Sequence, residues 1–419
     1  MSGGRQNEDS NGVSDRKSYL DVLKFIGIFF IYLGHMADAA GSFYPFVFMY
    51  HVPLFFFVSG CAETLGRKRS FPEYVIHKVK TILIPWLFFA LVSIVAYTVY
   101  ADRAFGLAEV RLSLVQILQG CVRNRFLAGS LWFFTCQFVI CIVFRLMEKW
   151  KHFFILLVCV LAYLAAAFLL PQNLPGEPSW YWNVDSAMYY MLYYCAGYLM
   201  FPGIDRILSG DRKNIDRPLS GDRKSADGTL SGDRKSADGT LSGNRKSIDS
   251  LLSGDKKRTD RVLSGSGENA DERSARVKSS AIGNMAVRIA AAAVWAACCV
   301  YTVLCYFGSD FLSFLWALPV AGTLIYYLQA LVIILFFLGI AWILRDVEAF
   351  RKIGRDTLYL CGNEMIIKEL IPAFAAVFGL EVSLDSTLET VVYIALLLVV
   401  TEKLLIPAEK QLLTRFTKS

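Results

Sequence analysis

The stretch KFIGIFFIYLGHM, Lys24 to Met36, decides the fold class, because it is a long apolar run with one cation at its start and one histidine near its end. A second histidine, His51, lies in the apolar run YHVPLFFFVSG that begins at Tyr50. The chain has only four histidines, and polar groups are costly in apolar surroundings. Both runs therefore predict membrane-spanning helices that carry functional groups.

The composition extends this prediction to the whole chain of 419 residues, of which 55% are hydrophobic. Apolar runs near 20 residues are long enough to cross a hydrocarbon core of about 30 Å as helices. They are continuously apolar, whereas a β-barrel needs alternating segments. We expect an all-α, polytopic integral membrane protein with about ten transmembrane helices. The expected spans are Leu20–Met36, Tyr44–Cys61, Thr81–Tyr100, Ser130–Leu146, Phe153–Leu170, Ala187–Phe201, Met285–Phe307, Ala321–Leu344, Leu358–Phe378 and Thr390–Ile406.

Polar segments divide the chain into parts. An eleven-residue repeat, with units such as LSGDRKSADGT, runs from Leu208 to Arg273 and has too few apolar residues to form a seam. It predicts a long, disordered cytoplasmic linker, although a basic surface touching anionic lipid is an alternative. The expected parts are a polar tail (1–18), a membrane domain with six helices before the linker (19–203) and four after it (284–408), the linker itself (204–283), and a second tail (409–419).

Basic residues concentrate in alternate loops, and the net charge is +7. The positive-inside rule then places both termini in the cytoplasm, with the protein in a plasma or inner membrane. The loop Ala101–Gly129 is an exception, since it is outer by this count yet contains four arginines. The first eighteen residues lack the apolar core of a cleavable signal peptide. The charge is better explained by orientation than by binding of nucleic acid, which we do not expect as a partner.

The ten cysteines do not indicate a redox or metal site. Nine of them lie in or beside apolar runs, where they behave as small hydrophobes, and only Cys121 sits clearly in a loop. The chain has no C-x-x-C pair and no cluster of cysteine and histidine in its polar loops. We therefore expect no bound metal.

Lys24 and His35 are eleven residues apart, close to three helical turns, so both should project from one face about 16 Å apart. Asp21 precedes Lys24 by three residues and can pair with it. His51 should lie at a depth similar to that of His35 on the next helix. Such histidines can be packed structural groups, general bases acting on a hydroxyl, or proton relays in a transporter. The residues alone leave these alternatives open.

Five motifs occur in order along the chain: YLDVLKFIGIFFIYLGHM, FMYHVPLFFFVSG, HKVKTILIPWLFF, GSLWFFTCQF and IGRDTLYLCGNEMIIK. Together they resemble the acyltransferase 3 family, and most closely its fucose 4-O-acetylase-like branch, whose members O-acetylate sugars. The resemblance implies a ten-helix membrane domain. It would transfer an acyl group, usually acetyl, from cytoplasmic acyl-CoA to a sugar hydroxyl handled at the outer side.

The resemblance also assigns roles to individual residues. His35 would be the catalytic base, and Lys24 stands where many members have arginine. Trp132 and Phe133 match the Leu-Trp-Phe signature of the family. Their rings would either pack against the sugar or acyl chain or belong to the bundle core.

The chain departs from the family in its last motif. Asn363 and Glu364 occupy the vicinity where the family commonly has a histidine. Lys368 follows Glu364 at helical i,i+4 spacing, which predicts a buried pair that is either structural or part of the acceptor site. Glu63 is expected to be solvated, and His77 and His152 to be interface anchors.

We therefore expect a membrane-bound O-acyltransferase with no permanently bound cofactor and with acyl-CoA, by resemblance acetyl-CoA, as co-substrate. Its partners would be the lipid bilayer, acyl-CoA and a glycan or lipid-linked sugar acceptor. A proton-coupled transporter and a catalytically altered sensor are the alternatives. The candidate catalytic residues are His35, His51 and Lys24; the candidate substrate-binding residues are Asp21, Trp132, Phe133, Asn363 and Glu364; the candidate acyl-CoA-binding residues are Arg67, Lys68, Lys78 and Lys80.

Overall fold

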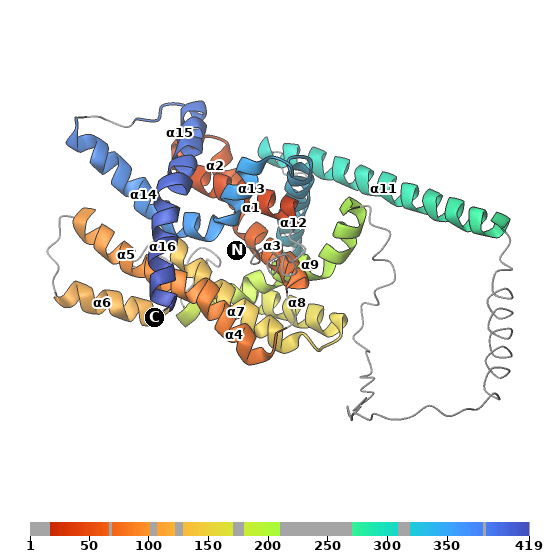
Figure 1. The fold of residues 1–419 in the computed structure, drawn as a ribbon, viewed down its shortest axis with the longest axis horizontal. Helices are drawn as coiled ribbons and strands as arrows, with labels where there is room; N and C mark the ends of the chain where they lie inside the picture. Colours follow the sequence, from red (N-terminus) through yellow and green to blue (C-terminus); the bar gives the residue numbers. More distant parts are fainter. Residues whose placement is uncertain are drawn as a thin grey trace, which may run out of the picture. The chain divides into compact units, whose positions relative to one another are not determined.

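The computed structural model describes residues 17–66, 69–100, 107–121, 129–170, 180–209, 270–308, 319–379 and 383–418 (Figure 1). These residues contain helices and no strand, which confirms the all-α prediction. The chain forms two compact units, one made of Met1–Leu208 with Val294–Ser419 and the other of Ser209–Ala293. Most of the predicted repeat linker lies outside the described residues. Its described residues at both ends are helical, because α9 extends to Ser209 and α11 begins at Ala270.

The helices follow the apolar runs in chain order. They are α1 (Ser18–Gly34), α2 (Phe43–Phe48), α3 (His51–Leu65), α4 (Phe71–Lys78), α5 (Ile84–Tyr100), α6 (Leu107–Leu118), α7 (Trp132–Met147), α8 (His152–Leu169), α9 (Val184–Ser209), α11 (Ala270–Tyr306), α12 (Pro319–Ile343), α13 (Glu348–Arg355), α14 (Thr357–Val377), α15 (Thr387–Val400) and α16 (Ile406–Lys418). Short 3-10 segments join some of them at Ala37–Ala40, Gly129–Leu131 and Tyr181–Asn183.

Seven described segments are long and apolar enough to cross a membrane. They are Phe43–Leu65, Phe71–Val95, Gly129–Met147, His152–Leu169, Met285–Tyr306, Gly322–Ile343 and Thr387–Arg415. The other three predicted spans fall on α1, α9 and α14, which are helical and carry polar residues.

The second predicted span is broken in the structure. Helix α2 ends at Phe48, Tyr50 has a φ of −142°, and α3 begins at His51. Pro53 therefore lies in the first turn of α3, where its missing N–H costs no hydrogen bond. The break places His51 at the end of a helix rather than in the middle of one. The sequence did not predict α6, which lies in the expected outer loop Ala101–Gly129.

Two π-helical segments precede prolines. Val79–Leu83 joins α4 to α5 just before Pro85, and Thr401–Leu405 joins α15 to α16 just before Pro407. A proline ring collides with the carbonyl of residue i−4, and the wider π turn relieves that collision. In the second segment Glu402 is buried and pairs with Lys352 of α13 at 2.8 Å. The hydrogen bond and charge of Glu402 raise the pKa of the Lys352 ammonium.

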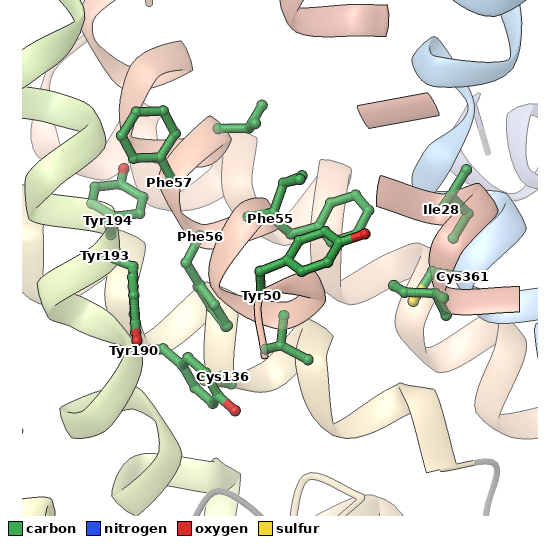
Figure 2. Packing of buried hydrophobic residues seen from close by; sticks show 14 of the residues in the cluster. Ile28, Tyr50, Phe55, Phe56, Phe57, Cys136, Tyr190, Tyr193, Tyr194 and Cys361 are labelled. Atoms are coloured by element: carbon green, nitrogen blue, oxygen red, sulfur yellow. The ribbon is translucent and has the colours of Figure 1, made fainter. Parts of the chain in front are cut away.

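Helix α1 lies at the centre of the first unit. It contacts α2, α3, α12, α13, α14 and α15, and most of its side chains are buried (Figure 1). Beside it, aromatic rings of α3 pack against α9, as Figure 2 shows for Phe56, Tyr190 and Tyr194. The rings of Phe56 and Tyr190 stack with centroids 4.8 Å apart. Such ring pairs add stability beyond the apolar area that they bury.

Helices α3 and α9 touch through a pair of glycines. A Cβ atom on Gly60 would lie 2.0 Å from the carbonyl oxygen of Tyr194, and one on Gly197 would lie 2.0 Å from that of Phe57. No side chain fits at either position, because the clash is with backbone rather than with a flexible side chain. Small residues permit this close approach of membrane helices.

We predict that Gly60→Val and Gly197→Val each lower stability by about 1–3 kcal/mol or more, because the two helices must separate. The measurement is the thermal unfolding midpoint of the purified protein in detergent. Gly203→Ala is the matched control, since nothing lies within 4 Å of a Cβ atom there. Unchanged midpoints for both valine variants would contradict the proposed crossing.

Candidate active site

A cavity of about 990 Å³ runs through the first unit. Its walls come mainly from α1, α3, α4, α7 and α14. The lining residues that bear on its chemistry are Lys24, His35, His51, Ser59, Glu63, Arg69, Tyr74, His77, Lys78, Ser130, Trp132, Phe133, Gln137, Arg355, Glu364 and Lys368.

The lining residues form stripes along two neighbouring helices. On α1 the stripe runs from Lys24 to Gly34 and ends at His35, just after the helix, and on α14 it runs from Thr357 to Lys368. The first and last residues of each stripe are eleven positions apart, or about 16 Å along a helix. Arg355, just before α14, pairs with Asp21 near the start of α1, and Glu364 meets His35 at its end, so the two helices run in the same direction. The predicted common face of Lys24 and His35 is confirmed, because both side chains line this one cavity.

Helix α3 runs in the opposite direction along the same cavity. Its first residue, His51, lies beside His35, and a Cβ atom on Gly27 of α1 would meet the side chains of Leu54 and Phe55. The cavity therefore has two chemically different ends. The histidine end holds His35, His51, Glu364 and Lys368; the basic end holds Lys24, Arg69, Lys78 and Arg355.

At the histidine end, the imidazole of His35 and the carboxylate of Glu364 form a close pair. His35 Nδ1 lies 2.9 Å from Glu364 Oε1, and the Glu364 side chain is only 2% exposed. A carboxylate partner favours the tautomer in which Nδ1 carries the proton, which leaves the lone pair on Nε2. The ring of His35 is 31% exposed and lines the cavity. This arrangement can accept a proton from a molecule in the cavity.

The second histidine is fixed in the same way by a backbone group. His51 Nδ1 lies 2.9 Å from the carbonyl oxygen of Val47, so it donates its proton there. The rings of His35 and His51 are nearly perpendicular, with centroids 6.2 Å apart. Sequence spacing predicted that the two imidazoles would sit at similar depth on adjacent helices, and the structure brings them together.

The i,i+4 spacing of Glu364 and Lys368 predicted that they pair with each other. In the structure each of them contacts His35 instead. The Lys368 ammonium donates to the backbone carbonyl of His35. His35 follows the last residue of α1, where carbonyl oxygens lack helical partners, so a cation there satisfies one of them. Glu364 Oε2 is buried and has no hydrogen-bond partner among the described residues. Two residues of α14 thus hold both the ring and the backbone of His35.

At the basic end, Asp21 holds two cations. Lys24 Nζ lies 3.2 Å from Asp21 Oδ1, as the i,i+3 spacing predicted, and Arg355 Nε lies 3.7 Å from Asp21 Oδ2. Asp21 is 2% exposed and lies behind the lining, whereas Lys24 and Arg355 both line the cavity. Its structural contribution is to fix the positions of these cations.

Glu63 was expected to be solvated, and that expectation is wrong. Its side chain is only 16% exposed. Its Oε2 accepts hydrogen bonds from the hydroxyls of Tyr74 at 3.0 Å and Tyr194 at 3.1 Å and from Lys78 Nζ at 3.4 Å. The donors lie on other helices, Tyr74 and Lys78 on α4 and Tyr194 on α9, so the helical period of α3 could not reveal them. This carboxylate orients Lys78, which lines the cavity.

The remaining predicted residues are distributed as follows. Trp132 is buried and Phe133 half-buried, and both line the cavity. Asn363 is held outside the lining, where its amide donates to Tyr359 and Glu409. Lys80 is exposed on the π segment before α5, and Arg67 and Lys68 lie outside the described residues.

Two histidines that we had set aside have different surroundings. His77 lines the cavity near its basic end, whereas the ring of His152 packs edge-on against Tyr198. Sequence reading also missed Arg69, Tyr74, Ser130 and Gln137 as lining residues; a stripe at helical spacing through α4 was the available signal for Tyr74. In the described part of the chain, no group of three or more His, Cys, Asp or Glu side chains could hold a metal ion.

Comparison with known families adds to this geometry. The acyltransferase domain family, acyltransferase 3, matches residues 17–400, and the chain belongs to that family. No curated protein and no solved structure gives a significant match. With its membrane-spanning helices, the chain is a membrane acyltransferase. The cavity with its two histidines is its candidate active site.

We predict that Glu63→Leu lowers stability by about 1–3 kcal/mol, because two tyrosine hydroxyls and an ammonium lose their common acceptor. Glu63→Gln retains an acceptor oxygen and should cost less. The readout is the thermal unfolding midpoint in detergent, with the exposed Glu348→Leu as control. If Glu63→Leu were as stable as the control, the three hydrogen bonds would make no measurable contribution to stability.

Proposed function

We propose that this membrane acyltransferase transfers an acetyl group from acetyl-CoA to a hydroxyl of a sugar or cell-surface glycan. The observation that carries the proposal is the His35–Glu364 pair at one end of a cavity whose other end is basic. The ordered motifs favour the fucose 4-O-acetylase-like branch. We also propose that the chain has ten membrane spans and that both termini lie in the cytoplasm. Because Lys24 lies near the start of the first helix, the basic end of the cavity would then face the cytoplasm.

The basic end suits an anionic acyl donor. Coenzyme A carries its phosphates on the nucleotide, and Lys78, Arg69 and Arg355 line this end of the cavity. Arg67, Lys68 and Lys80 remain proposed contributors to acyl-CoA binding because they lie next to Arg69 and Lys78 in the sequence. Lys24 lies at this same end, held beside Arg355 by Asp21, where its ammonium would be passed by the arm that carries the thioester.

The histidine end suits activation of the acceptor. His35 Nε2 would take the proton of the acceptor hydroxyl as its oxygen attacks the thioester carbonyl. The carbon–sulfur bond then breaks, and the imidazolium returns the proton to the sulfur as coenzyme A leaves. Glu364 would stabilise the imidazolium that forms, and His51 would bind or orient the acceptor. A route through an acyl intermediate would use the same base.

Trp132 and Phe133 line the cavity as aromatic surface, which can pack against a sugar ring or the acyl group. Asn363 and Asp21 would act indirectly. Asn363 ties α14 to α16 through Glu409, and Asp21 fixes Lys24. Both therefore support the substrate site from behind its wall.

We predict that His35→Ala lowers transfer at least about 100-fold, because the general base is lost. Glu364→Gln should cause a smaller loss, since a neutral amide stabilises the imidazolium less. The assay follows radiolabel from acetyl-CoA onto glycan or lipid-linked sugar, in membranes that contain folded protein.

His152→Ala is the matched control, because that histidine packs against Tyr198 outside the cavity and should leave transfer unchanged. Full transfer by folded His35→Ala would refute the assignment of the base. Movement of an unmodified substrate across vesicles, with no label transferred by the wild type, would instead establish the transporter alternative. If the wild type neither transfers label nor moves a substrate, the catalytically altered sensor is the alternative that remains.

We predict that Lys78→Met raises KM for acetyl-CoA about tenfold while kcat changes little, because it removes a contact to the nucleotide that is the same in ground and transition states. The effect should shrink at high salt, which screens charge. Steady-state kinetics measure both constants. The exposed Lys149→Met is the control, and an unchanged KM for Lys78→Met would contradict this role.

A further inference from the structure

Gln137 lines the cavity with half of its amide group unsatisfied. The residue is 7% exposed, and its Nε2 donates to Cys141 Sγ at 3.2 Å. Its Oε1 is buried and has no hydrogen-bond partner among the described residues. Turning the amide over exchanges the two ends and still leaves one of them unsatisfied. Because buried polar atoms nearly always find a partner, an unpaired one on a residue that lines the cavity points to a ligand group.

Contacts one turn to each side fix the level of Gln137 along α7. Before it, the ring of Phe133 packs on that of Phe56 of α3, with centroids 5.0 Å apart. After it, the carbonyl of Cys141 accepts the hydroxyl of Tyr74, the same hydroxyl that reaches Glu63. Gln137 therefore lies between the aromatic part of the cavity and its basic end.

The same contacts place Gln137 level with Ser59 of α3. Phe56 precedes Ser59 by three residues and Glu63 follows it by four, while Phe133 and Cys141 flank Gln137 by four on either side. Both Ser59 and Gln137 line the cavity. The two residues form a short polar level, and the neighbouring lining on α3 and α7 is apolar: Phe55, Val58, Ala62, Trp132 and Phe133.

An acyl-CoA donor presents matching chemistry at this level. Its pantetheine arm joins the anionic nucleotide to the sulfur and carries two amide groups within an otherwise apolar chain. If the nucleotide lies at the basic end and the thioester reaches the histidine end, the amides must pass the middle of the cavity. An amide N–H can donate to the glutamine oxygen, and an amide carbonyl can accept from its nitrogen.

We propose that Gln137, with Ser59 beside it, is the binding site for an amide of the pantetheine arm. The proposal rests on acyl-CoA being the donor. Gln137 would bind the acyl-CoA molecule and takes no part in the proton transfer at His35. Its unsatisfied amide is retained because the ligand completes it.

The first test uses coenzyme A itself as the ligand and thermal unfolding in detergent as the readout. Binding to the folded state raises the unfolding midpoint of the wild type. Gln137→Leu should respond much less, although its unliganded midpoint should equal or exceed that of the wild type. Gln137→Met serves as a second apolar variant in case the leucine does not pack.

Gln116 of α6 provides a matched control. It is also buried, 3% exposed, with an Oε1 that has no partner in the described chain, but it lies outside the cavity lining. Gln116→Leu removes the same chemical group and should keep the full response to coenzyme A. An equal response from wild type, Gln137→Leu and Gln137→Met would overturn the proposal.

A kinetic test separates the arm from the rest of the donor. Gln137→Leu should raise KM for acetyl-CoA about tenfold, the effect of one lost hydrogen bond, and leave kcat nearly unchanged. With S-ethyl thioacetate, a donor without amides, wild type and variant should be equally slow. A variant that loses the same factor with both donors would overturn the assignment.

The two proposals fail differently. If the wild type transfers label from acetyl-CoA but Gln137→Leu matches it in KM and in thermal response, only the pantetheine site is wrong. If the wild type neither transfers label nor responds to coenzyme A, the acyl-CoA donor is wrong and the pantetheine site falls with it.

Discussion

The hydrogen bond between His35 and Glu364 joins residues 329 positions apart and holds α1 and α14 side by side. Lys368 strengthens this junction by reaching the backbone of His35. A buried carboxylate is costly unless it is paired, so Glu364 needs the imidazole as much as the imidazole needs an orienting partner. The end of α1 therefore has its position set by α14 rather than by its own loop.

The other end of the cavity follows the same principle with different charges. Asp21 fixes Lys24 and Arg355, and Glu63 fixes Lys78 together with two tyrosines. At both ends a carboxylate behind or within the wall positions a group that faces the interior. Between the two ends of the cavity, aromatic packing and the glycine contact hold α3 against α9.

Much of this arrangement could be predicted from the sequence, because it depends on helical period. The eleven-residue spacing put Lys24 and His35 on one face, the three-residue spacing paired Lys24 with Asp21, and the apolar runs marked the helices. The ordered motifs identified the family. These features are local, or repeat along a single helix, and so a single sequence contains them.

What the sequence could not reveal depends on contacts between helices. The partner of His35 was visible only once α14 lay beside α1, and Glu63 looked like a residue at a helix end until Tyr74 and Tyr194 surrounded it. The break before His51 also went unseen, because the run from Tyr44 to Cys61 is apolar throughout. Gln137 gave no signal, since one glutamine in an apolar helix is informative only when its surroundings are known.

The π segment Val79–Leu83 has a consequence for how the basic end can change. One extra residue in a turn rotates everything before it by about 100° relative to everything after it. The faces of α4 and α5 are set out of phase by this turn, and it is this offset that lets Tyr74 and Lys78 line the cavity while α5 packs on α14. The lining of α4 is thus governed by residue count as well as by residue identity. A substitution there exchanges one side chain, whereas a single deletion would turn Tyr74, His77 and Lys78 away from the cavity together.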